Sequence, residues 1–376
     1  MRQIIRCVSI PSRVRAASVA ALAFVALATL GALAAPAARA FEVGYNVAWI
    51  EEAYGSDFTS RWDEAAVDRA LYRTRVFGGG VARLWLFEGQ QKDGAVFQGT
   101  RATGLAPHFL ERIQRTCEIA RRRGVKIYWT GMNGNWPWAK TGTWANIHYN
   151  ICNDKYGEAQ SFRARALGPV LDVLARNADT VYAFDVMNEV EGSVSQWFWP
   201  EGWTGARRWI RDEVAFVRTH LPGVAVTASA GWDSAAKDLV AGRFSGLGLD
   251  FYDIHVYDDR GRIPEASGLA LLQMRTATPI LLGEFGQKTA RVDDAIQRRS
   301  SAGFLENARA ARFLGALGWR LDDERPAVAG YQAYHSYVLN DRERPVVADV
   351  RAFVARVGAD RRSAIEQVRA WRAGRP

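Results

Sequence analysis

The sequence is poor in cysteine. Only Cys7, Cys117 and Cys152 occur among its 376 residues, and Cys7 lies in an N-terminal segment that we expect to be removed. At most one disulfide bond is then available, because an oxidising compartment would allow Cys117 and Cys152 to pair. The chain also lacks linker-like, low-complexity and repeated segments, so nothing divides its folded part into several domains.

The motifs of several enzyme classes are missing as well. No glycine-rich phosphate loop follows the first apolar run, since Gly44 is the only glycine of residues 44–49. The same run holds no His-x-His pair of the kind found in metal-dependent barrel hydrolases, and the chain has no nucleophilic serine elbow. Acidic and histidine residues gather between Asp253 and Asp259, but on one segment without separate partners. We therefore expect neither a cofactor nor a metal.

The N-terminal segment has the composition of a secretory signal peptide. Residues 1–40 begin with four arginines, continue as an uncharged apolar run over residues 16–38, and end on Ala38-Arg39-Ala40. This order of basic, apolar and small-x-small residues is that of an export signal with its cleavage site. A membrane anchor is the alternative, because the apolar run approaches the length of a spanning helix. We expect a secreted or periplasmic protein made of residues 41–376.

Net charge is modest once this segment is set aside. Five of the 49 basic residues and none of the 40 acidic residues lie in it, which leaves 44 basic against 40 acidic residues, a net charge of +4. Such a balance does not indicate nucleic acid or an acidic polymer as a partner. We expect a monomer that binds no nucleic acid and, after cleavage, no membrane.

Short apolar runs rich in β-branched and aromatic residues alternate with stretches of helical spacing. We expect eight strands, at residues 43–49, 82–87, 126–130, 181–187, 224–230, 250–256, 279–285 and 330–337. Helices are expected at residues 60–76, 107–123, 158–177, 204–220, 234–241, 268–276, 300–317 and 345–357. Eight repeats favour a single-domain α/β fold, the (β/α)8 TIM barrel, over an open doubly wound sheet. Residues 361–372 are expected to add an outer C-terminal helix.

Two of the predicted strands end in a glutamate. The fourth runs through Met187 and Asn188 to Glu189, and the seventh runs through Gly283 to Glu284. A carboxylate at the end of an apolar strand is costly to desolvate, so it is usually paired or functional. Structural ion pairs with barrel arginines are the alternative, but two such glutamates across one barrel mouth favour a functional role. Carboxyl groups about 5 to 5.5 Å apart would suit a retaining double displacement on a glycoside.

These strand ends resemble the motifs of a known family. Asn188-Glu189 and Glu284-Phe285-Gly286 are similar to the Asn-Glu and Glu-Phe-Gly motifs of clan A glycoside hydrolases, especially family 5 endo-glycanases such as cellulases and β-mannanases. The resemblance covers nearly all of residues 41–376 as an order of strands, although only a few short motifs carry the identity. It implies Glu189 as general acid/base and Glu284 as nucleophile.

The resemblance also implies roles for four further polar residues. Asn188 matches the asparagine that hydrogen-bonds the sugar 2-hydroxyl, a bond that strengthens in the transition state. His255 and Tyr257 match a His-x-Tyr motif, in which the tyrosine contacts the nucleophile and the histidine lines the adjacent sugar site. A histidine satisfied within the core is the alternative for His255. Arg83 matches the arginine that bonds the nucleophile and keeps its pKa low.

The chain departs from this family at three places. Val190 replaces the proline that usually follows the acid/base, and Asn133 ends the third strand where many family 5 cellulases have histidine. The tryptophan that usually ends the eighth strand beneath the reacting sugar is missing from residues 330–337, where Tyr334 is the best match. These differences leave the subfamily open.

Tryptophans are frequent in the loops expected at the catalytic end. Seven of the fourteen follow the third, fourth and fifth strands, namely Trp136, Trp138, Trp144, Trp197, Trp199, Trp203 and Trp232. Aromatic faces stack on the apolar faces of sugar rings, although about half of such residues could simply cover the barrel mouth. Their number favours several sugar subsites, to which we assign Trp136 and Trp232, and endo-action over exo-action.

The residues together predict a secreted retaining endo-β-glycosidase. Its expected partner is a polysaccharide or oligosaccharide, most readily a β-1,4-glucan, a β-mannan or a related exopolysaccharide. The alternative is a barrel that has lost catalysis and only binds carbohydrate. The presence of Glu189 and Glu284 with Asn188 and Tyr257 beside them argues against such a loss.

Overall fold

The computed structural model describes residues 41–50, 57–87, 94–134, 143–154, 157–195, 197–322 and 332–357. The chain divides into the units Met1–Arg39 and Ala40–Pro376, and all described residues belong to the second. The predicted signal peptide and the predicted helix at residues 361–372 lie outside them. Within the described part, no helix combines the length and the apolar character that crossing a membrane requires.

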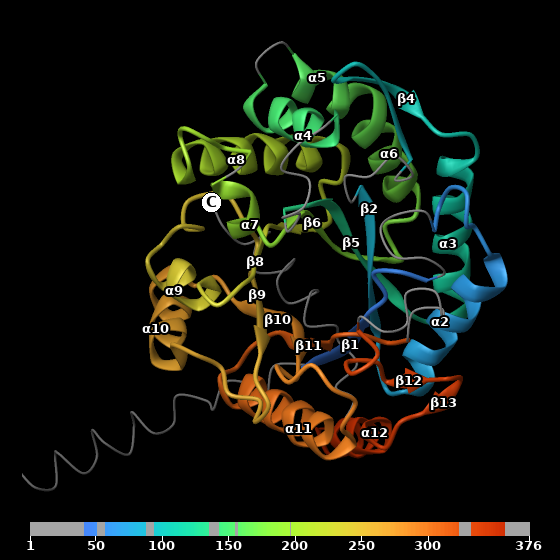
Figure 1. Cartoon of the computed structure of the whole chain (residues 1–376), viewed down its shortest axis with the longest axis vertical. Helices are drawn as coiled ribbons and strands as arrows, with labels where there is room; N and C mark the ends of the chain where they lie inside the picture. The colour runs from blue at the N-terminus through green and yellow to red at the C-terminus, as the bar shows by residue number, and fades with distance from the viewer. Residues whose placement is uncertain are drawn as a thin grey trace, which may run out of the picture. The chain divides into compact units, whose positions relative to one another are not determined.

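A nine-stranded sheet forms the centre of the second unit, with helices around it (Figure 1). Its order is β7-β6-β5-β2-β1-β11-β10-β9-β8, and its paired strands are parallel. Only Ala228 separates β7 from β8, so the two edges of the sheet belong to one interrupted strand and the barrel closes there. The strands are β1 (Glu42–Asn46), β2 (Val81–Phe87), β5 (Lys126–Asn133), β6 (Val181–Asn188), β7 (Ala225–Thr227), β8 (Ser229–Ala230), β9 (Tyr252–Tyr257), β10 (Ile280–Gly286) and β11 (Gly315–Gly318). The predicted (β/α)8 barrel is confirmed.

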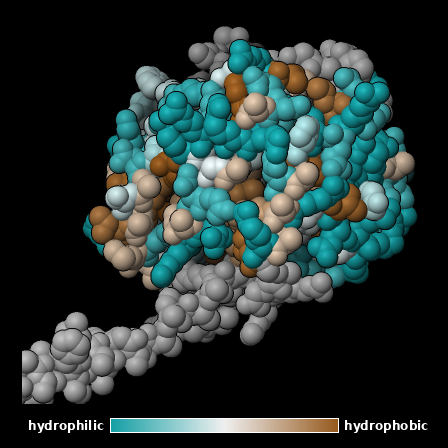
Figure 2. Space-filling view, turned by 90° about the horizontal axis from the view of Figure 1, so that it is seen from below, coloured by the Kyte–Doolittle hydropathy of each residue, from teal (hydrophilic) through white to brown (hydrophobic). Residues whose placement is uncertain are grey.

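The helices follow the strands along the chain. The main ones are α2 (Glu64–Val76), α3 (Phe109–Arg123), α6 (Gly168–Arg176), α8 (Trp203–His220), α9 (Ala235–Val240), α10 (Ala266–Thr276), α11 (Asp294–Ala310) and α12 (Val346–Val357). Smaller elements are β3 (Ala95–Gln98), β4 (Arg101–Leu105), α4 (Thr143–Asn153), α5 (Glu158–Phe162), the π-helical turn η1 (Arg163–Leu167), α7 (Glu191–Val194), β12 (Val338–Leu339) and β13 (Arg342–Glu343). The face drawn in Figure 2 is largely hydrophilic, with hydrophobic residues in small separate groups, as expected for outer helices.

Local sequence accounts for where the helices begin and end. Asp63 precedes α2 and accepts hydrogen bonds from the backbone N–H groups of Ala65 and Ala66, which an intrahelical partner cannot satisfy. Gly124 ends α3 in the left-handed region, with φ of 65°, where glycine carries no Cβ penalty. Both features fix the helices that flank β2.

The barrel interior changes from apolar to charged along the strands. Near the strand beginnings lies a buried cluster of Val81, Tyr128, Tyr182, Ala183, Ala225, Phe251, Leu281, Leu314 and Leu317. Toward the strand ends the buried side chains are polar: Asn46, Arg83, Asp185, Asn188, Asp253, His255 and Glu284. Catalytic groups of such barrels project from the carboxyl ends of the strands, so this polar layer is where a site is expected.

The eighth strand is not where the sequence indicated. The predicted strand at residues 330–337 is wrong, because the barrel is completed by β11 at Gly315–Gly318, which overlaps the end of the predicted helix at residues 300–317. Two glycines of β11 let neighbouring groups approach: a Cβ on Gly315 would lie 2.2 Å from the Glu42 carbonyl oxygen, and one on Gly318 would lie 2.5 Å from the Tyr337 hydroxyl. This tight packing required small residues, and a strand of glycine, alanine and leucine carries no β-branched signal.

The two cysteines of the described part are unpaired. Cys117 on α3 and Cys152 on α4 are both free and buried. The disulfide that the sequence left open is therefore absent from this structure.

Candidate active site

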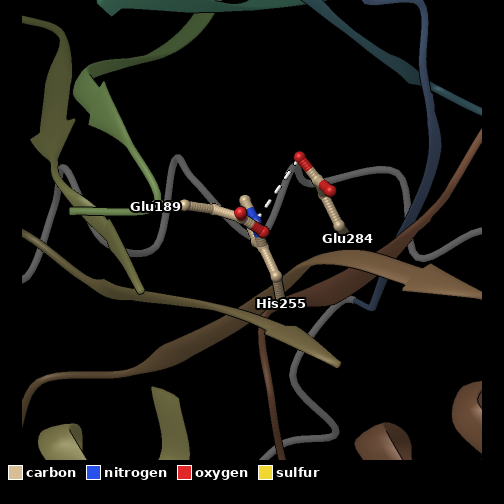
Figure 3. Close-up of side chains that lie close together, drawn as sticks. All are labelled: Glu189, His255 and Glu284. Carbon is tan, nitrogen blue, oxygen red and sulfur yellow. Dashed lines mark hydrogen bonds and ion pairs between the residues drawn. The ribbon is translucent and has the colours of Figure 1, made fainter. Parts of the chain in front are cut away.

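Glu189 and Glu284 meet at the carboxyl ends of the strands. Glu189 directly follows β6 in a left-handed backbone conformation with φ of 48°, and Glu284 lies within β10. Their exposed fractions are 6% and 3%. Figure 3 shows the side chains of Glu189, Glu284 and His255 of β9 close together, and one ligand atom from each of the three residues lies within 4.8 Å of the others. Two carboxylates therefore face one shared space.

Glu284 is held by two strong donors. Arg83 of β2 donates from Nη1 to Glu284 Oε1 at 2.6 Å, and the Tyr257 hydroxyl donates to Glu284 Oε2 at 2.7 Å. Both bonds join the residues that the sequence had assigned to this neighbourhood. Because donors to an ionised carboxylate are especially strong, they fix the orientation of the Glu284 side chain.

Arg83 is itself enclosed by acceptors. Its Nη2 donates to Asp185 Oδ2 and to Asn188 Oδ1, each at 2.8 Å, and its Nη1 also donates to Asn46 Oδ1 at 3.1 Å. The side chain is fully buried, and the carboxylates of Asp185 and Glu284 balance its charge. Asp185 and Asn46 were not singled out from the sequence, although each is a polar residue near the end of a barrel strand.

Burial changes the acidity of Glu284. It raises the pKa of Glu284 above the ordinary value, while the charges of His255 and Arg83 and the hydrogen bond from Tyr257 act in the opposite direction. Arg83 thus acts on the pKa of Glu284 in the expected direction, but burial outweighs it and the net shift is upward. The cost of desolvating a carboxylate exceeds the effect of its cationic neighbours here.

His255 contacts both carboxylates. Its Nδ1 lies 3.0 Å from Glu189 Oε1 and 3.4 Å from Glu284 Oε1, and its Nε2 lies 3.8 Å from Asp253 Oδ2. Burial alone would lower the pKa of His255, but the negative charges of Glu284 and Asp253 and the hydrogen bond with Glu189 raise it to about 10. Near neutral pH this favours the protonated ring, which can donate from Nδ1 toward the carboxylates.

Asn188 links this network to the neighbouring strand. Its Oδ1 accepts from Arg83, and its Nδ2 donates to Asn133 Oδ1 at 3.0 Å. Asn133 ends β5 at the position where the sequence departs from the histidine of many family 5 cellulases. It thus serves here as an acceptor that orients the Asn188 amide.

An aromatic cluster lies beside Tyr257. Trp49, Trp85 and Trp319 pack together with ring centroids 5.5 to 5.9 Å apart, and Tyr257 packs against them. Trp319 directly follows β11, and its backbone N–H donates to the Phe285 carbonyl at 2.8 Å. A tryptophan therefore does end the eighth strand of this barrel.

Tyr334 does not occupy that position. It lies in a turn beyond β11, half-buried, with its ring centroid 4.2 Å from that of His335. The prediction that Tyr334 ends the eighth strand is wrong, for the same reason that the strand itself was misplaced. The signal for Trp319 was present in Gly318-Trp319, but the preceding residues read as the end of a helix.

The loop tryptophans differ in exposure. Trp232, which comes two residues after β8, is 51% exposed, and Trp199 is 65% exposed. Trp197 is buried and stacks on His148 with ring centroids 4.6 Å apart, while Trp203 packs edge-on against Phe244. Trp136, Trp138 and the side chain of Trp144 lie outside the described residues. Among the four whose side chains the structure describes, Trp199 and Trp232 thus present exposed aromatic surface.

Comparison with known proteins places the fold among solved enzymes. No family model matches the chain, and no curated protein matches its sequence. A β-1,4-mannanase from the sea hare Aplysia kurodai is 17% identical, with a TM-score of 0.60 over 88% of this chain and 95% of that one.

Two bacterial structures are similar to the same degree. A GH5_18 enzyme variant from Streptomyces cattleya, in complex with Manβ1-4GlcNAc, is 18% identical, with a TM-score of 0.61 over 89% of this chain and 82% of that one. The exo-β-1,4-mannosidase Op5Man5 from Opitutaceae bacterium strain TAV5 is 17% identical, with a TM-score of 0.60 over 86% of this chain and 61% of that one. The chain shares the (β/α)8 fold of these glycosidases, which include enzymes of the family that its motifs resemble.

Proposed function

We propose that this protein is a retaining β-glycoside hydrolase with Glu284 as nucleophile and Glu189 as general acid/base. The observation that carries the proposal is the pair of carboxyl groups, which have ligand atoms within 4.8 Å of each other and both contact His255. Retaining enzymes place their two carboxyls about 5 to 5.5 Å apart, whereas inverting enzymes leave about 6.5 to 9.5 Å for a water molecule.

The surroundings of the two groups suit these roles. An oxygen of Glu284, oriented by Arg83 and Tyr257, attacks the anomeric carbon while Glu189 gives its proton to the departing glycosidic oxygen. The resulting glycosyl ester on Glu284 is then hydrolysed by a water that Glu189 deprotonates, which restores both side chains. Asn188, which Arg83 and Asn133 orient, is the proposed partner of the sugar hydroxyl next to the reacting carbon.

For the substrate we propose a β-1,4-linked polysaccharide, with mannan first and glucan or a related exopolysaccharide next. The motifs support this choice, and so do the names of the mannanase and mannosidase neighbours. Trp319 is the proposed platform beneath the reacting sugar, and the exposed ring of Trp232 is a further stacking surface. We propose endo-action on the strength of the loop tryptophans, and export by residues 1–40 on the strength of their composition.

A panel of soluble β-mannan, β-glucan, xylan and galactan tests this proposal. We expect new reducing ends from at least one of them, oligosaccharide products of several lengths, and a first-formed product that keeps the β configuration by NMR. Release of single sugars only would contradict endo-action, and a first-formed α product would contradict retention. Binding without any new reducing ends would instead support the alternative of an inactive carbohydrate-binding barrel.

A further inference from the structure

Glu191 lies two residues after Glu189 and takes no part in the chemistry described above. We propose that Glu191 is a positioning residue: it holds the backbone of Gly231 against the carboxyl group of Glu189 and so fixes the acid/base for proton transfer. The inference rests on the proposed function, because it concerns how Glu189 delivers its proton. Neither the family motifs nor the sequence pattern had assigned a role to Glu191 or Gly231.

The contact between Glu191 and Gly231 is direct. Glu191 Oε2 accepts a hydrogen bond from the Gly231 backbone N–H at 2.9 Å. Glu191 begins the short helix α7, and Gly231 directly follows β8, so the bond joins two segments that are 40 residues apart in sequence. Although the residue is partly exposed, Glu191 Oε1 is buried and has no hydrogen-bond partner among the described residues.

Gly231 in turn lies against the Glu189 carboxyl. A Cβ built on Gly231 would lie 2.3 Å from Cδ and from Cγ of Glu189 and 2.5 Å from its Oε1. No real Cβ fits at such distances, so only glycine lets the backbone approach this side chain. The backbone of Gly231 is not in the left-handed region, so its need for glycine comes from the contact with Glu189 and not from its backbone conformation.

Other contacts hold the backbone of Glu189 but not its carboxyl group. Ser229 Oγ accepts from the Glu189 N–H and the Ser229 carbonyl accepts from the Val190 N–H, each at 3.1 Å. These bonds support the left-handed φ of 48° at Glu189, a conformation that costs about 1 kcal/mol or more in a non-glycine residue. The side chain itself contacts His255 through Oε1 and lies against the backbone of Gly231.

The protonation of Glu191 fits this role. Burial raises the pKa of Glu191 to about 8, against the opposing effect of the Gly231 N–H, and the negative charges of Glu189 and of Asp238 on α9 raise it further. At neutral pH the group is therefore an uncharged acid. It supplies an acceptor to Gly231 without adding a second negative charge beside Glu189, and a glutamine would do the same.

The test uses leaving groups of different acidity. The step that kcat/KM reports is the departure of the leaving group from the sugar. Dinitrophenolate departs with little help from a proton, whereas the phenolate of a phenyl glycoside needs the proton of the general acid. For Glu191→Met we expect kcat/KM to fall about tenfold or more on the phenyl glycoside and less than about threefold on the dinitrophenyl glycoside. Glu191→Gln keeps an acceptor for the Gly231 N–H, so its kcat/KM on the phenyl glycoside should stay within about threefold of wild type.

Two further variants distinguish a loss of positioning from a loss of stability. Gly231→Ala should show the same selective loss, because its Cβ displaces the Glu189 carboxyl while the Glu191 bond is kept. Glu213 on α8 is a matched control, because it is a buried glutamate. Burial raises the pKa of Glu213 to about 7, and its carboxylate pairs with Arg163 at 2.9 Å. Glu213→Met should lower the melting temperature and change kcat/KM on the two glycosides by the same factor.

The outcomes separate this inference from the proposed function. Equal losses on both glycosides in Glu191→Met and Gly231→Ala, or no loss on either, would overturn the positioning role. A wild-type protein that cleaves no glycoside would overturn the proposed function itself. If the wild-type enzyme is active but Glu189→Ala lowers kcat/KM equally on both glycosides, Glu189 is not the general acid. The positioning role of Glu191 would then fail as well.

Discussion

The two glutamates are buried to a similar degree but have different neighbours. Glu284 lies within a strand and accepts bonds from a guanidinium and a phenol, at 2.6 and 2.7 Å. Glu189 lies in a strained turn, bonds His255 at 3.0 Å, and otherwise touches the backbone of Gly231. No hydrogen bond to Glu189 Oε2 occurs within the described ranges. One carboxyl is thus held through both of its oxygens, and the other keeps an oxygen for the substrate.

This difference suggests why the roles are not interchangeable. A nucleophile must stay ionised and aimed at one carbon, and fixed donors to both oxygens serve that purpose. An acid/base must gain and lose a proton in every turnover, so permanent donors on both oxygens would hinder it. The predictions below test this contrast, beginning with the largest expected effect.

Glu284→Gln should abolish turnover. The amide keeps the shape of the side chain but cannot form the glycosyl ester, so kcat/KM should fall by about 10⁴-fold or more even on activated glycosides. Steady-state kinetics with a dinitrophenyl glycoside measures the loss, and calorimetry should show that oligosaccharide binding is kept. A variant with full activity would exclude Glu284 as nucleophile and remove one side of the contrast.

Glu189→Ala should lose activity in a way that depends on the leaving group. Without the acid, kcat/KM should fall by roughly 10²- to 10⁴-fold on a polysaccharide or phenyl glycoside. On the dinitrophenyl glycoside the fall should be far smaller, because that leaving group departs without protonation. A Brønsted plot over a series of aryl glycosides measures the dependence, and an unchanged slope would contradict the assignment.

Trp319→Ala should weaken catalysis on the Glu284 side of the site. The ring packs with Trp49, Trp85 and Tyr257, and its removal should lower kcat/KM by roughly 30-fold, equivalent to about 2 kcal/mol. Tyr334→Ala is the matched control and should cost less than about threefold. A larger loss for Tyr334→Ala than for Trp319→Ala would instead indicate Tyr334 as the residue beneath the reacting sugar. Thermal melts of both variants exclude a loss of folded protein.

Tyr257→Phe should have the smallest effect and a defined pH dependence. The Tyr257 hydroxyl lowers the pKa of Glu284 by its hydrogen bond, so its removal should raise that pKa. Because Glu284 must be ionised to attack, the acidic limb of the kcat/KM profile should move to higher pH, and the loss of about tenfold should grow as pH falls. A shift of that limb to lower pH would contradict the role of Tyr257.

Much of the fold followed from periodicity, because seven of the eight barrel strands carry apolar runs with β-branched or aromatic residues. The eighth did not, since β11 is built from Gly315-Ala316-Leu317-Gly318 and its need for small residues arises from Glu42 and Tyr337, which are distant in sequence. From the sequence pattern alone, small unbranched residues fit a helix as well as a strand.

The site was predictable where a residue ends a strand and less so where a contact crosses the barrel. Both glutamates, with Arg83 and Tyr257, were found from strand ends and motifs. Asn46 and Asp185 were not, and Asn133 was noted only as a departure from the family, because their partners come from other strands. Gly231 could not be found at all from sequence, because its importance lies in a contact distance and not in a pattern.

The most direct test of the central claim is the stereochemistry of azide products. In Glu284→Ala, azide should enter the space left by the nucleophile and give an α-glycosyl azide from an activated β-glycoside. In Glu189→Ala, azide should instead attack the glycosyl ester on Glu284 and give a β-glycosyl azide. NMR of the two products distinguishes them. The account predicts α for the first variant and β for the second, and the opposite assignment would contradict it.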